Sequence, residues 1–267
     1  MFKILSKIRL RAYILYSVLF NDTIKAQVKN PFSIPIIIIN YNQLESLKNL
    51  IESLIKRGFY NIVILDNHSP YPPLLDYYKT IQENPKVTLH LLNDNLGHTV
   101  FWLRKDILNL YSKGYYVVTD PDLLIEDSVP NDFMKIFIHL INKHIEVKKV
   151  GFSLRIDDIP DYYPNKEKVI KWEEQFWKEQ QNDGHFISRI DTTFALYRPG
   201  FIYDSNGYES SIRTKPPYIV KHLGWYIDYK NLSEEQKFYI NNANSSSSWL
   251  VDGEGNLTSE RANKHYE

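Results

Sequence analysis

Short apolar runs alternate with amphipathic segments along the first half of the chain. Four runs are rich in β-branched and aromatic residues and end abruptly in polar ones, which is typical of buried strands; they occupy residues 36–39, 61–65, 87–92 and 115–118. The segments between them carry apolar residues at helical spacing and predict helices at 44–56, 74–84 and 100–110. This alternation predicts an α/β fold with an open, mostly parallel, Rossmann-like sheet and helices on both faces.

Polar side chains follow each of the first three expected strands. Asn40, Tyr41 and Asn42 come after the first strand, Asp66 after the second, and residues 93–97 after the third. These positions lie at the carboxyl edge of a parallel sheet, where open α/β folds bind their ligands. The sequence contains no G-x-G-x-x-G and no Walker lysine motif, which disfavours a dinucleotide enzyme or a P-loop NTPase.

Two carboxylates follow the fourth strand, at Asp120 and Asp122, with Pro121 between them. In an extended segment residues i and i+2 point the same way, so both carboxylates can face one ligand. Neighbouring carboxylates repel each other unless a cation lies between them, and Mg²⁺ or Mn²⁺ suits oxygen ligands. The alternative interpretation is a turn with two solvated aspartates.

The second half of the chain has a less regular pattern. It predicts helices at 131–143 and 170–181, and strands at 150–154 and 190–197. From residue 241 onward the chain is polar with little periodicity, so residues 241–267 are expected to form a tail.

Composition narrows the class of protein. A formal net charge of zero provides no global field that favours nucleic acid. The chain has no cysteine, which excludes a disulfide framework or a thiolate metal site and suits a reducing compartment such as the cytoplasm. No apolar stretch of the sequence reaches the roughly 18 to 20 residues of a membrane span.

Residues 1–20 combine an apolar helical face with four basic side chains, those of Lys3, Lys7, Arg9 and Arg11. A basic amphipathic helix within residues 1–30 can lie on an anionic membrane surface. Two alternatives stay open. One is a signal peptide, although no small-residue cleavage site follows the apolar part, and the other is a helix that packs on the domain or on a partner subunit.

With these elements in order, residues 33–226 resemble the nucleotide-sugar-dependent glycosyltransferases of the GT-A fold, and most of all the bacterial family 2 enzymes. The resemblance rests on the loops after the first three strands and on Asp120-Pro121-Asp122, which matches the DxD motif. Two features depart from the family pattern. The residue five positions after Gly97 is Trp102 rather than an arginine, and the second-strand loop reads Asp66-Asn67-His68-Ser69-Pro70.

The resemblance implies that a nucleotide sugar, with a UDP-sugar favoured, binds across the strand ends. The residues that it implies for donor binding are Asn40, Tyr41, Asn42, Asp66, Asn95, Gly97, Asp120 and Lys221. It implies a site for Mn²⁺ or Mg²⁺ formed by Asp120 and Asp122, with His222 matching the histidine that completes the metal site in such enzymes. Lys221, next to this histidine, can face the diphosphate.

An inverting transferase needs a carboxylate base that takes the proton of the acceptor hydroxyl. The resemblance places this base some distance after the DxD motif, and Asp191 is the candidate. Asp157, Asp158 and Asp183 are rivals. A retaining mechanism without a dedicated base is the alternative.

The expected protein is therefore a metal-dependent glycosyltransferase of hexosyltransferase type. Residues 31–240 are expected to form the GT-A domain, with a nucleotide-sugar-binding half at 31–125 and an acceptor-side half at 126–240. By family analogy the acceptor is a glycan or glycolipid in bacterial surface polysaccharide or lipopolysaccharide synthesis, at the cytoplasmic face of the inner membrane. A non-catalytic nucleotide- or glycan-binding module of the same fold is the alternative from another class.

Overall fold

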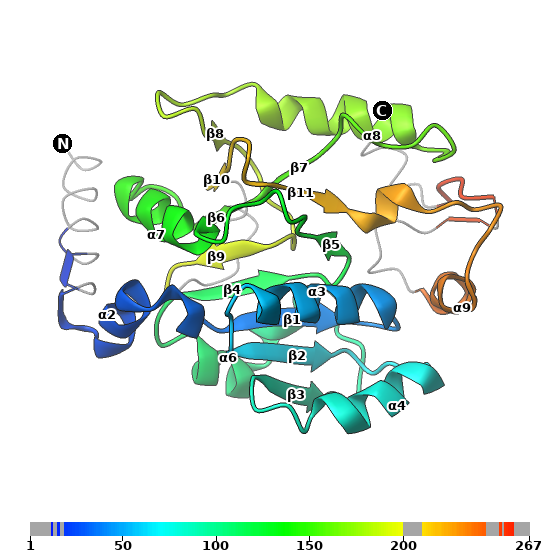
Figure 1. Cartoon of the computed structure of the whole chain (residues 1–267), viewed down its shortest axis with the longest axis horizontal. Coiled ribbons are helices and arrows are strands. Elements are labelled where there is room, and N and C mark those ends of the chain that lie inside the picture. Colours follow the sequence, from blue (N-terminus) through cyan, green and yellow to red (C-terminus); the bar gives the residue numbers. More distant parts are fainter. Residues whose placement is uncertain are drawn as a thin grey trace.

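The computed structural model describes residues 19–199 and 210–243 without a break, together with Ala12, Leu15, Tyr16, Val251, Asp252 and 254–258. Within them, eight strands form one sheet in the order β3-β2-β1-β4-β9-β6-β10-β8 (Figure 1). Three further strands form a small sheet in the order β5-β11-β7. The α/β class predicted from the sequence is confirmed.

The four strands of the first half lie close to the predicted positions. They are β1 (Ile36–Asn40), β2 (Ile62–Asp66), β3 (Val87–Leu91) and β4 (Tyr116–Thr119). All their mutual pairings are parallel, and their carboxyl ends point to the same edge. Ile36 and Ile38 belong to one apolar cluster and Ile37 and Ile39 to another, because successive side chains of a strand point to opposite faces. Burial on both faces explains why this run is apolar throughout.

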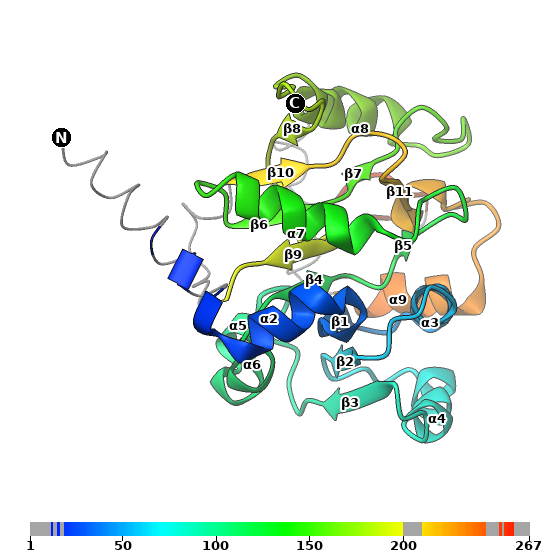
Figure 2. The ribbon, with the colours of Figure 1, turned by 60° about the vertical axis from the view of Figure 1, so that its left-hand side comes forward.

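Helices cover both faces of this sheet (Figure 2). The cluster of Ile36 and Ile38 contains side chains of α2 (Asp22–Lys29), α3 (Glu45–Lys56), α4 (Pro72–Ile81) and α7 (Phe133–Lys143). The opposite cluster contains side chains of α5 (Val100–Leu103) and α6 (Lys105–Tyr111). The single helix predicted at 100–110 is wrong, because the backbone leaves the helical region at Arg104, where ψ is 85°.

The second half extends the same sheet with mixed pairing. Strand β9 (Ala195–Tyr197) lies antiparallel between β4 and β6 (Lys149–Gly151). Strand β10 (Ser211–Arg213) runs parallel to β6, and β8 (Phe186–Ile187) runs antiparallel to β10.

The strand predicted at 150–154 is in fact two strands in different sheets. Strand β6 ends at Gly151, and β7 (Ser153–Leu154) pairs with β11 (Ile219–His222) of the small sheet. Phe152 lies between them, with its ring 4.9 Å from that of Phe137 and 5.0 Å from that of Phe133. Burial of this ring among neighbouring aromatics accompanies the crossing of the chain from one sheet to the other.

Two further predictions from the second half need correction. The helix predicted at 170–181 begins and ends earlier, as α8 (Lys166–Glu173) followed by the 3₁₀ helix η2 (Glu174–Trp177). The strand predicted at 190–197 begins only at Ala195. Before it, Thr192 donates a hydrogen bond to Asp120, just after β4, instead of forming strand pairs. The remaining short elements are β5 (Leu123–Leu124) and the 3₁₀ helices η1 (Pro31–Ser33) and η4 (Leu223–Tyr226).

Helix α9 (Glu234–Asn242) lies beside the carboxyl edge of the sheet (Figure 1) and does not follow from the sequence pattern. It begins with a capping box in which Ser233 and Gln236 exchange hydrogen bonds, and it buries no residue. It is held by its contacts instead, since the Phe238 ring lies 4.8 Å from that of Tyr71 and Tyr41 donates a hydrogen bond to the Asn242 carbonyl at 3.0 Å.

Residues 1–11 of the expected N-terminal helix, with Lys3, Lys7, Arg9 and Arg11, lie outside the described residues, as do 200–209 and most of the tail. Ala12, Leu15, Tyr16, Leu19 and Phe20 are helical. No helix in the described part of the chain is long and apolar enough to cross a membrane.

Candidate active site

Asp120 and Asp122 lie at the carboxyl end of the sheet, just after β4, which pairs with β1 through Thr119 and Ile38. Thr192 connects this segment to Asp191. Its hydroxyl donates to Asp120 Oδ2 at 2.5 Å, and its carbonyl accepts from the Asp120 amide at 3.1 Å. Its own amide donates to Asp191 Oδ1 at 2.8 Å. The structure therefore brings Asp191 to the DxD segment through one intervening threonine.

The electrostatics of these carboxylates favour a cation. Burial raises the pKa of Asp120 well above its ordinary value, and the charges of Asp122 and Asp191 raise it further, while the bond from Thr192 opposes the shift. Three carboxylates that influence one another repel when all are ionised, and a divalent ion would relieve that repulsion.

His222 lies next to Asp122 because β5 and β11 pair antiparallel, with His222 opposite Leu123. The Nε2 atom of His222 is 3.7 Å from Oδ2 of Asp122, and the Leu223 amide donates to the Asp122 carbonyl at 2.7 Å. The imidazole stacks on Trp225 with ring centroids 4.9 Å apart, which fixes the orientation of the ring.

Two observations bear on whether Asp122 and His222 could hold a metal ion. Oδ1 of Asp122 and Nδ1 of His222 are buried and have no hydrogen-bond partner among the described residues. A Cβ placed on Gly224 would lie 3.0 Å from His222 Nδ1 and 3.6 Å from Asp122 Oδ2, so the glycine leaves space beside both side chains. The described residues contain no group of three or more His, Cys, Asp or Glu side chains that could hold a metal. A metal here would therefore have these two side chains as ligands among the described residues, and its remaining ligands would come from elsewhere.

The residues predicted for the nucleoside lie together at the ends of β1 and β2. Asn40 donates to the hydroxyl of Tyr78 at 2.8 Å, and that hydroxyl donates to Asp66 Oδ2 at 2.7 Å. The other oxygen of Asp66 accepts from the Ser69 amide at 2.9 Å. Asp66 is thus buried with a partner on each oxygen, whereas Oδ1 of Asn40 is buried without one among the described residues.

The side-chain amide of Asn67 links the loops that follow β2 and β3. Asn67 donates to the Gly97 carbonyl at 3.1 Å and accepts from the Leu96 amide at 2.8 Å. The Asn95 side chain accepts from the Gly97 amide at 3.0 Å, and Gly97 has a φ of +75°, which favours glycine. Asn95 and Gly97 are therefore fixed beside the end of β2.

Asn42 ends the β1 loop in the left-handed region, with a φ of 54°. Its amide donates to the Ser69 hydroxyl at 2.8 Å, and its side-chain nitrogen is buried without a partner among the described residues. Tyr41, beside it, contacts α9 instead through its hydroxyl. The β1 loop therefore presents amide groups at the same edge as the carboxylates.

Lys221 forms ion pairs that the sequence did not indicate. Its ammonium is 2.5 Å from Asp158 and 3.3 Å from Glu126, and the bond to Asp158 raises the pKa of Lys221. Arg155 joins the same network, 3.2 Å from Glu126 and 3.7 Å from Asp158. We call Glu126, Arg155, Asp158 and Lys221 the ion-pair network; it connects β11 to the segments that follow β5 and β7.

The rivals of Asp191 for the role of base are all engaged in ion pairs. Asp158 pairs with Lys221, Asp157 is 3.9 Å from Arg155, and Asp183 is 2.5 Å from Lys143. Asp191 lies beside the Asp120–Asp122 segment, to which its neighbour Thr192 is hydrogen-bonded.

Several site residues were missed at the sequence level. Thr192 follows Asp191 directly, and Asn67 follows Asp66, so proximity to a predicted residue was the available signal. The sequence carried no signal for Tyr78 and Glu126, because their contacts join segments that are distant in the sequence.

No protein-family model matches the chain, and no curated protein matches it. Among solved structures, the mannosyltransferase PcManGT from Pyrobaculum calidifontis in complex with GDP-Man and Mn²⁺ aligns with 80% of this chain at 15% identity and a TM-score of 0.43. The crystal structure of a mycobacterial protein aligns with 70% of this chain at 12% identity and a TM-score of 0.41. The chain spans 66% of the length of each of these proteins. Similarity at this level says nothing about the activity of this chain.

Proposed function

We propose that this protein is a metal-dependent glycosyltransferase of the GT-A type, which moves a sugar from a nucleoside diphosphate donor to a glycan or glycolipid. One observation carries the proposal: Asp122 and His222 meet beside Gly224, and each has a buried polar atom without a partner among the described residues. This pair adjoins the carboxylates of Asp120 and Asp191 at the ligand-binding edge of an open α/β sheet.

Asp122 and His222 are the side chains that would hold Mn²⁺ or Mg²⁺. When bound, the ion stabilises the negative charge that develops on the diphosphate leaving group. Neutral imidazole is a good ligand for Mn²⁺, which favours manganese of the two ions. Asp120, whose carboxylate accepts a hydrogen bond from the Thr192 hydroxyl, is assigned to donor binding.

The amides at the ends of the first three strands are assigned to the nucleoside. Asn40 and Asn42 lie at this edge, and each has a buried polar atom without a partner among the described residues. Asp66 supports Asn40 through Tyr78, and Asn95 and Gly97 form the adjoining loop. A UDP-sugar is the donor that we favour. Lys221 is assigned to the ion-pair network rather than to the diphosphate.

Asp191 is the proposed base of an inverting reaction. It would accept the proton of the acceptor hydroxyl as that oxygen attacks the anomeric carbon and the nucleoside diphosphate leaves. Its carboxylate is exposed, as access for an acceptor requires, and the Thr192 amide holds one of its oxygens.

The test is a donor panel. The full-length protein would be incubated with UDP-, GDP-, CDP- and dTDP-sugars, with and without Mn²⁺, and the released nucleoside diphosphate measured. We expect release from one nucleotide class, dependent on metal and reduced at least a hundredfold by Asp191→Asn with donor affinity retained. Release without metal, or full activity in the Asp191→Asn variant, would contradict the assignment.

We also propose that the N-terminal helix lies on an anionic membrane surface. Leu15, Tyr16, Leu19 and Phe20 are 52–63% exposed, although they are large apolar side chains. The sequence before them contains Lys3, Lys7, Arg9 and Arg11, which suit anionic lipid headgroups. This position agrees with a lipid-linked acceptor and a role in surface polysaccharide or lipopolysaccharide synthesis at the cytoplasmic membrane face.

A further inference from the structure

The segment that leads to Asp191 has no regular secondary structure, yet three of its consecutive carbonyl groups are held by buried side chains. Ser211 donates its hydroxyl to the Ser188 carbonyl at 2.5 Å, and Arg213 donates Nε to the Arg189 carbonyl at 2.5 Å. Lys149 donates Nζ to the Ile190 carbonyl. We call Lys149, Ser211 and Arg213 the carbonyl cradle.

The geometry of two strands produces this cradle. Ser211 and Arg213 are two residues apart in β10, so their side chains point to the same face of the sheet. Lys149 is the register partner of Ser211 in the neighbouring strand β6, which places it on that face as well. The three donors therefore form a group under the segment at residues 188–190.

Two members of the cradle are basic side chains that have been removed from water. Lys149 is 1% exposed and Arg213 is 3% exposed. Burial of a charge is costly unless polar partners compensate it. Arg213 has such a partner in the buried Glu173, at 2.6 Å, and Lys149 lies within electrostatic range of Asp191. Apolar side chains at these positions would avoid the cost of burying charge. The two buried basic side chains therefore indicate that the segment they hold needs hydrogen-bond donors for its carbonyl groups.

The held segment ends in the residues that reach the DxD motif. Asp191 follows Ile190 directly, and the next residue, Thr192, donates its hydroxyl to Asp120. A shift of the segment would therefore move the proposed base relative to the donor site. Misplacement of a catalytic group by about 1 Å can cost a hundredfold in rate.

We propose that Lys149 and Arg213 are positioning residues that fix Asp191 by holding the carbonyl groups of the two residues before it. Neither side chain touches the donor or the metal in this assignment, which rests on the proposed role of Asp191 as the base.

The test compares Lys149→Met with Lys148→Met in the full-length protein. Both variants exchange a lysine for a side chain of similar length, but Lys148 lies just before β6 and is partly exposed, whereas Lys149 is buried. In Lys149→Met we expect kcat to fall about a hundredfold, with KM for the donor and metal-dependent nucleotide affinity unchanged within twofold. Lys148→Met should retain the wild-type kcat. A kcat within twofold of wild type in Lys149→Met would overturn the proposal.

Hydrogen exchange provides a readout that does not depend on activity. The amides of residues 188–193 should exchange faster in Lys149→Met than in the wild type and in Lys148→Met, and unchanged protection there would overturn the positioning role. If Lys149→Met does not fold, Ser211→Ala removes one donor of the cradle and should raise exchange in the same segment, with unchanged exchange again overturning the proposal. A wild-type protein without transfer activity would refute the proposed function, while the exchange experiment would still decide whether the cradle holds the segment.

Discussion

Asp122 and His222 face a space that exists only because residue 224 is a glycine. A Cβ at Gly224 would lie 2.9 Å from the His222 imidazole, so the ring would have to shift from its stacked position on Trp225. We expect Gly224→Ala to weaken Mn²⁺-dependent nucleotide binding at least tenfold, while unfolding free energy without ligands changes by less than about 1 kcal/mol. Calorimetric titration with nucleotide and Mn²⁺ measures the first quantity and urea unfolding the second. Unchanged metal-dependent affinity would show that the ion binds elsewhere.

Lys149 makes stability depend on pH in a defined window. Burial lowers its pKa from 10.5 to about 7, with Asp191 opposing the shift and Arg213 adding to it. Between about pH 7 and pH 10 the unfolded chain therefore binds more protons than the folded one, so the contribution of Lys149 to stability rises with pH. Between pH 7 and pH 9 we expect the wild type to gain about 2 kcal/mol relative to Lys149→Met in urea unfolding. A difference between the two proteins that stays constant over this range would refute the lowered pKa.

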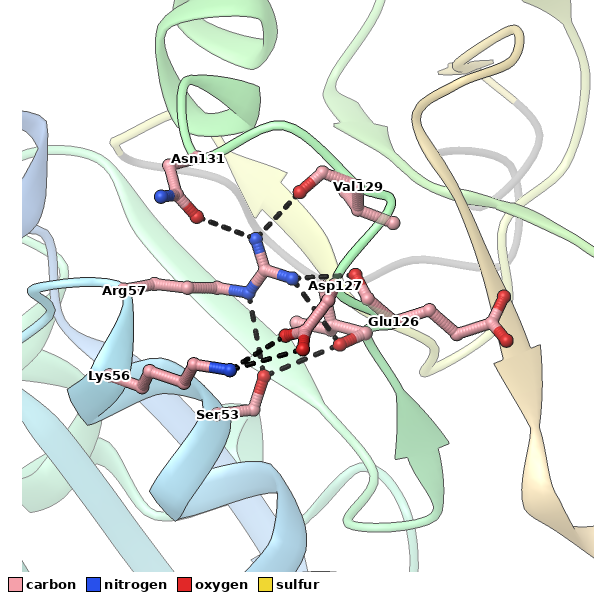
Figure 3. Close-up of polar contacts among 8 residues, drawn as sticks. Ser53, Lys56, Arg57, Glu126, Asp127, Val129 and Asn131 are labelled. Carbon is pink, nitrogen blue, oxygen red and sulfur yellow. Dashed lines mark hydrogen bonds and ion pairs between the residues drawn. The ribbon is translucent and has the colours of Figure 1, made fainter.

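At the scale of elements, Arg57 at the end of α3 holds the turn between β5 and α7 (Figure 3). It is 7% exposed and donates to the Val129 carbonyl at 2.7 Å, the Glu126 carbonyl at 2.6 Å and the Asn131 side chain at 2.7 Å. In this way it fixes the backbone from which Glu126 reaches Lys221.

Arg57→Met should destabilise the protein by about 2–4 kcal/mol, because buried carbonyl groups lose their donor. The matched control is Lys56→Met, since Lys56 pairs with Asp127 at 2.9 Å but the two side chains are 70% and 85% exposed. Lys56→Met should lower the free energy of unfolding by less than about 1 kcal/mol. Urea unfolding of both variants measures these free energies, and an equal loss of stability in the two variants would contradict the role of Arg57.

Elements that depend on local pattern could be predicted from the sequence. Strands β1 to β4 and helices α3, α4 and α7 lie within a few residues of their predicted positions, because each shows its own periodicity. The break at Arg104 and the division of 150–154 at Phe152 depend on tertiary packing, which no local pattern records.

The residues of the candidate site likewise fall into those that the local sequence pattern predicts and those that depend on tertiary packing. Asp120 and Asp122 follow a recognisable strand, so their position could be derived from the chain. The partners of Lys221 could not, because Glu126 and Asp158 reach it only through the small sheet. The carbonyl cradle likewise depends on the pairing of β6 with β10, two strands far apart in the sequence.

For the whole molecule, one eight-stranded sheet contains strands from both of the halves expected from the sequence. The residues proposed for the nucleoside and Asp191 therefore belong to one continuous framework. The exposed apolar side chains of the N-terminal helix lie apart from it in the sequence, so membrane binding can be tested separately.

Replacement of Leu15 and Leu19 by serine should weaken binding to vesicles of anionic phospholipid at least tenfold, because each leucine loses about 1.5–3 kcal/mol of burial in the interface. Leu103 and Leu110 are 57% and 58% exposed, so their replacement by serine is the matched control and should have no effect. Vesicle cosedimentation measures both. Equal binding by the wild type and the Leu15/Leu19 variant would show that this helix does not meet the membrane.

The central claim is that Asp122 helps to hold a metal that binds the donor diphosphate. The most direct measurement is the thermal stability of the wild type and of Asp122→Asn with UDP, GDP, CDP and dTDP, each with and without Mn²⁺. A ligand at about 100 times its Kd stabilises the folded state by about 2.7 kcal/mol, which corresponds to roughly 5–10 °C for a chain of this size. The account predicts such a shift for one nucleotide in the wild type only with Mn²⁺, and no shift in Asp122→Asn. The same shift in both proteins, or none with any nucleotide, would contradict it.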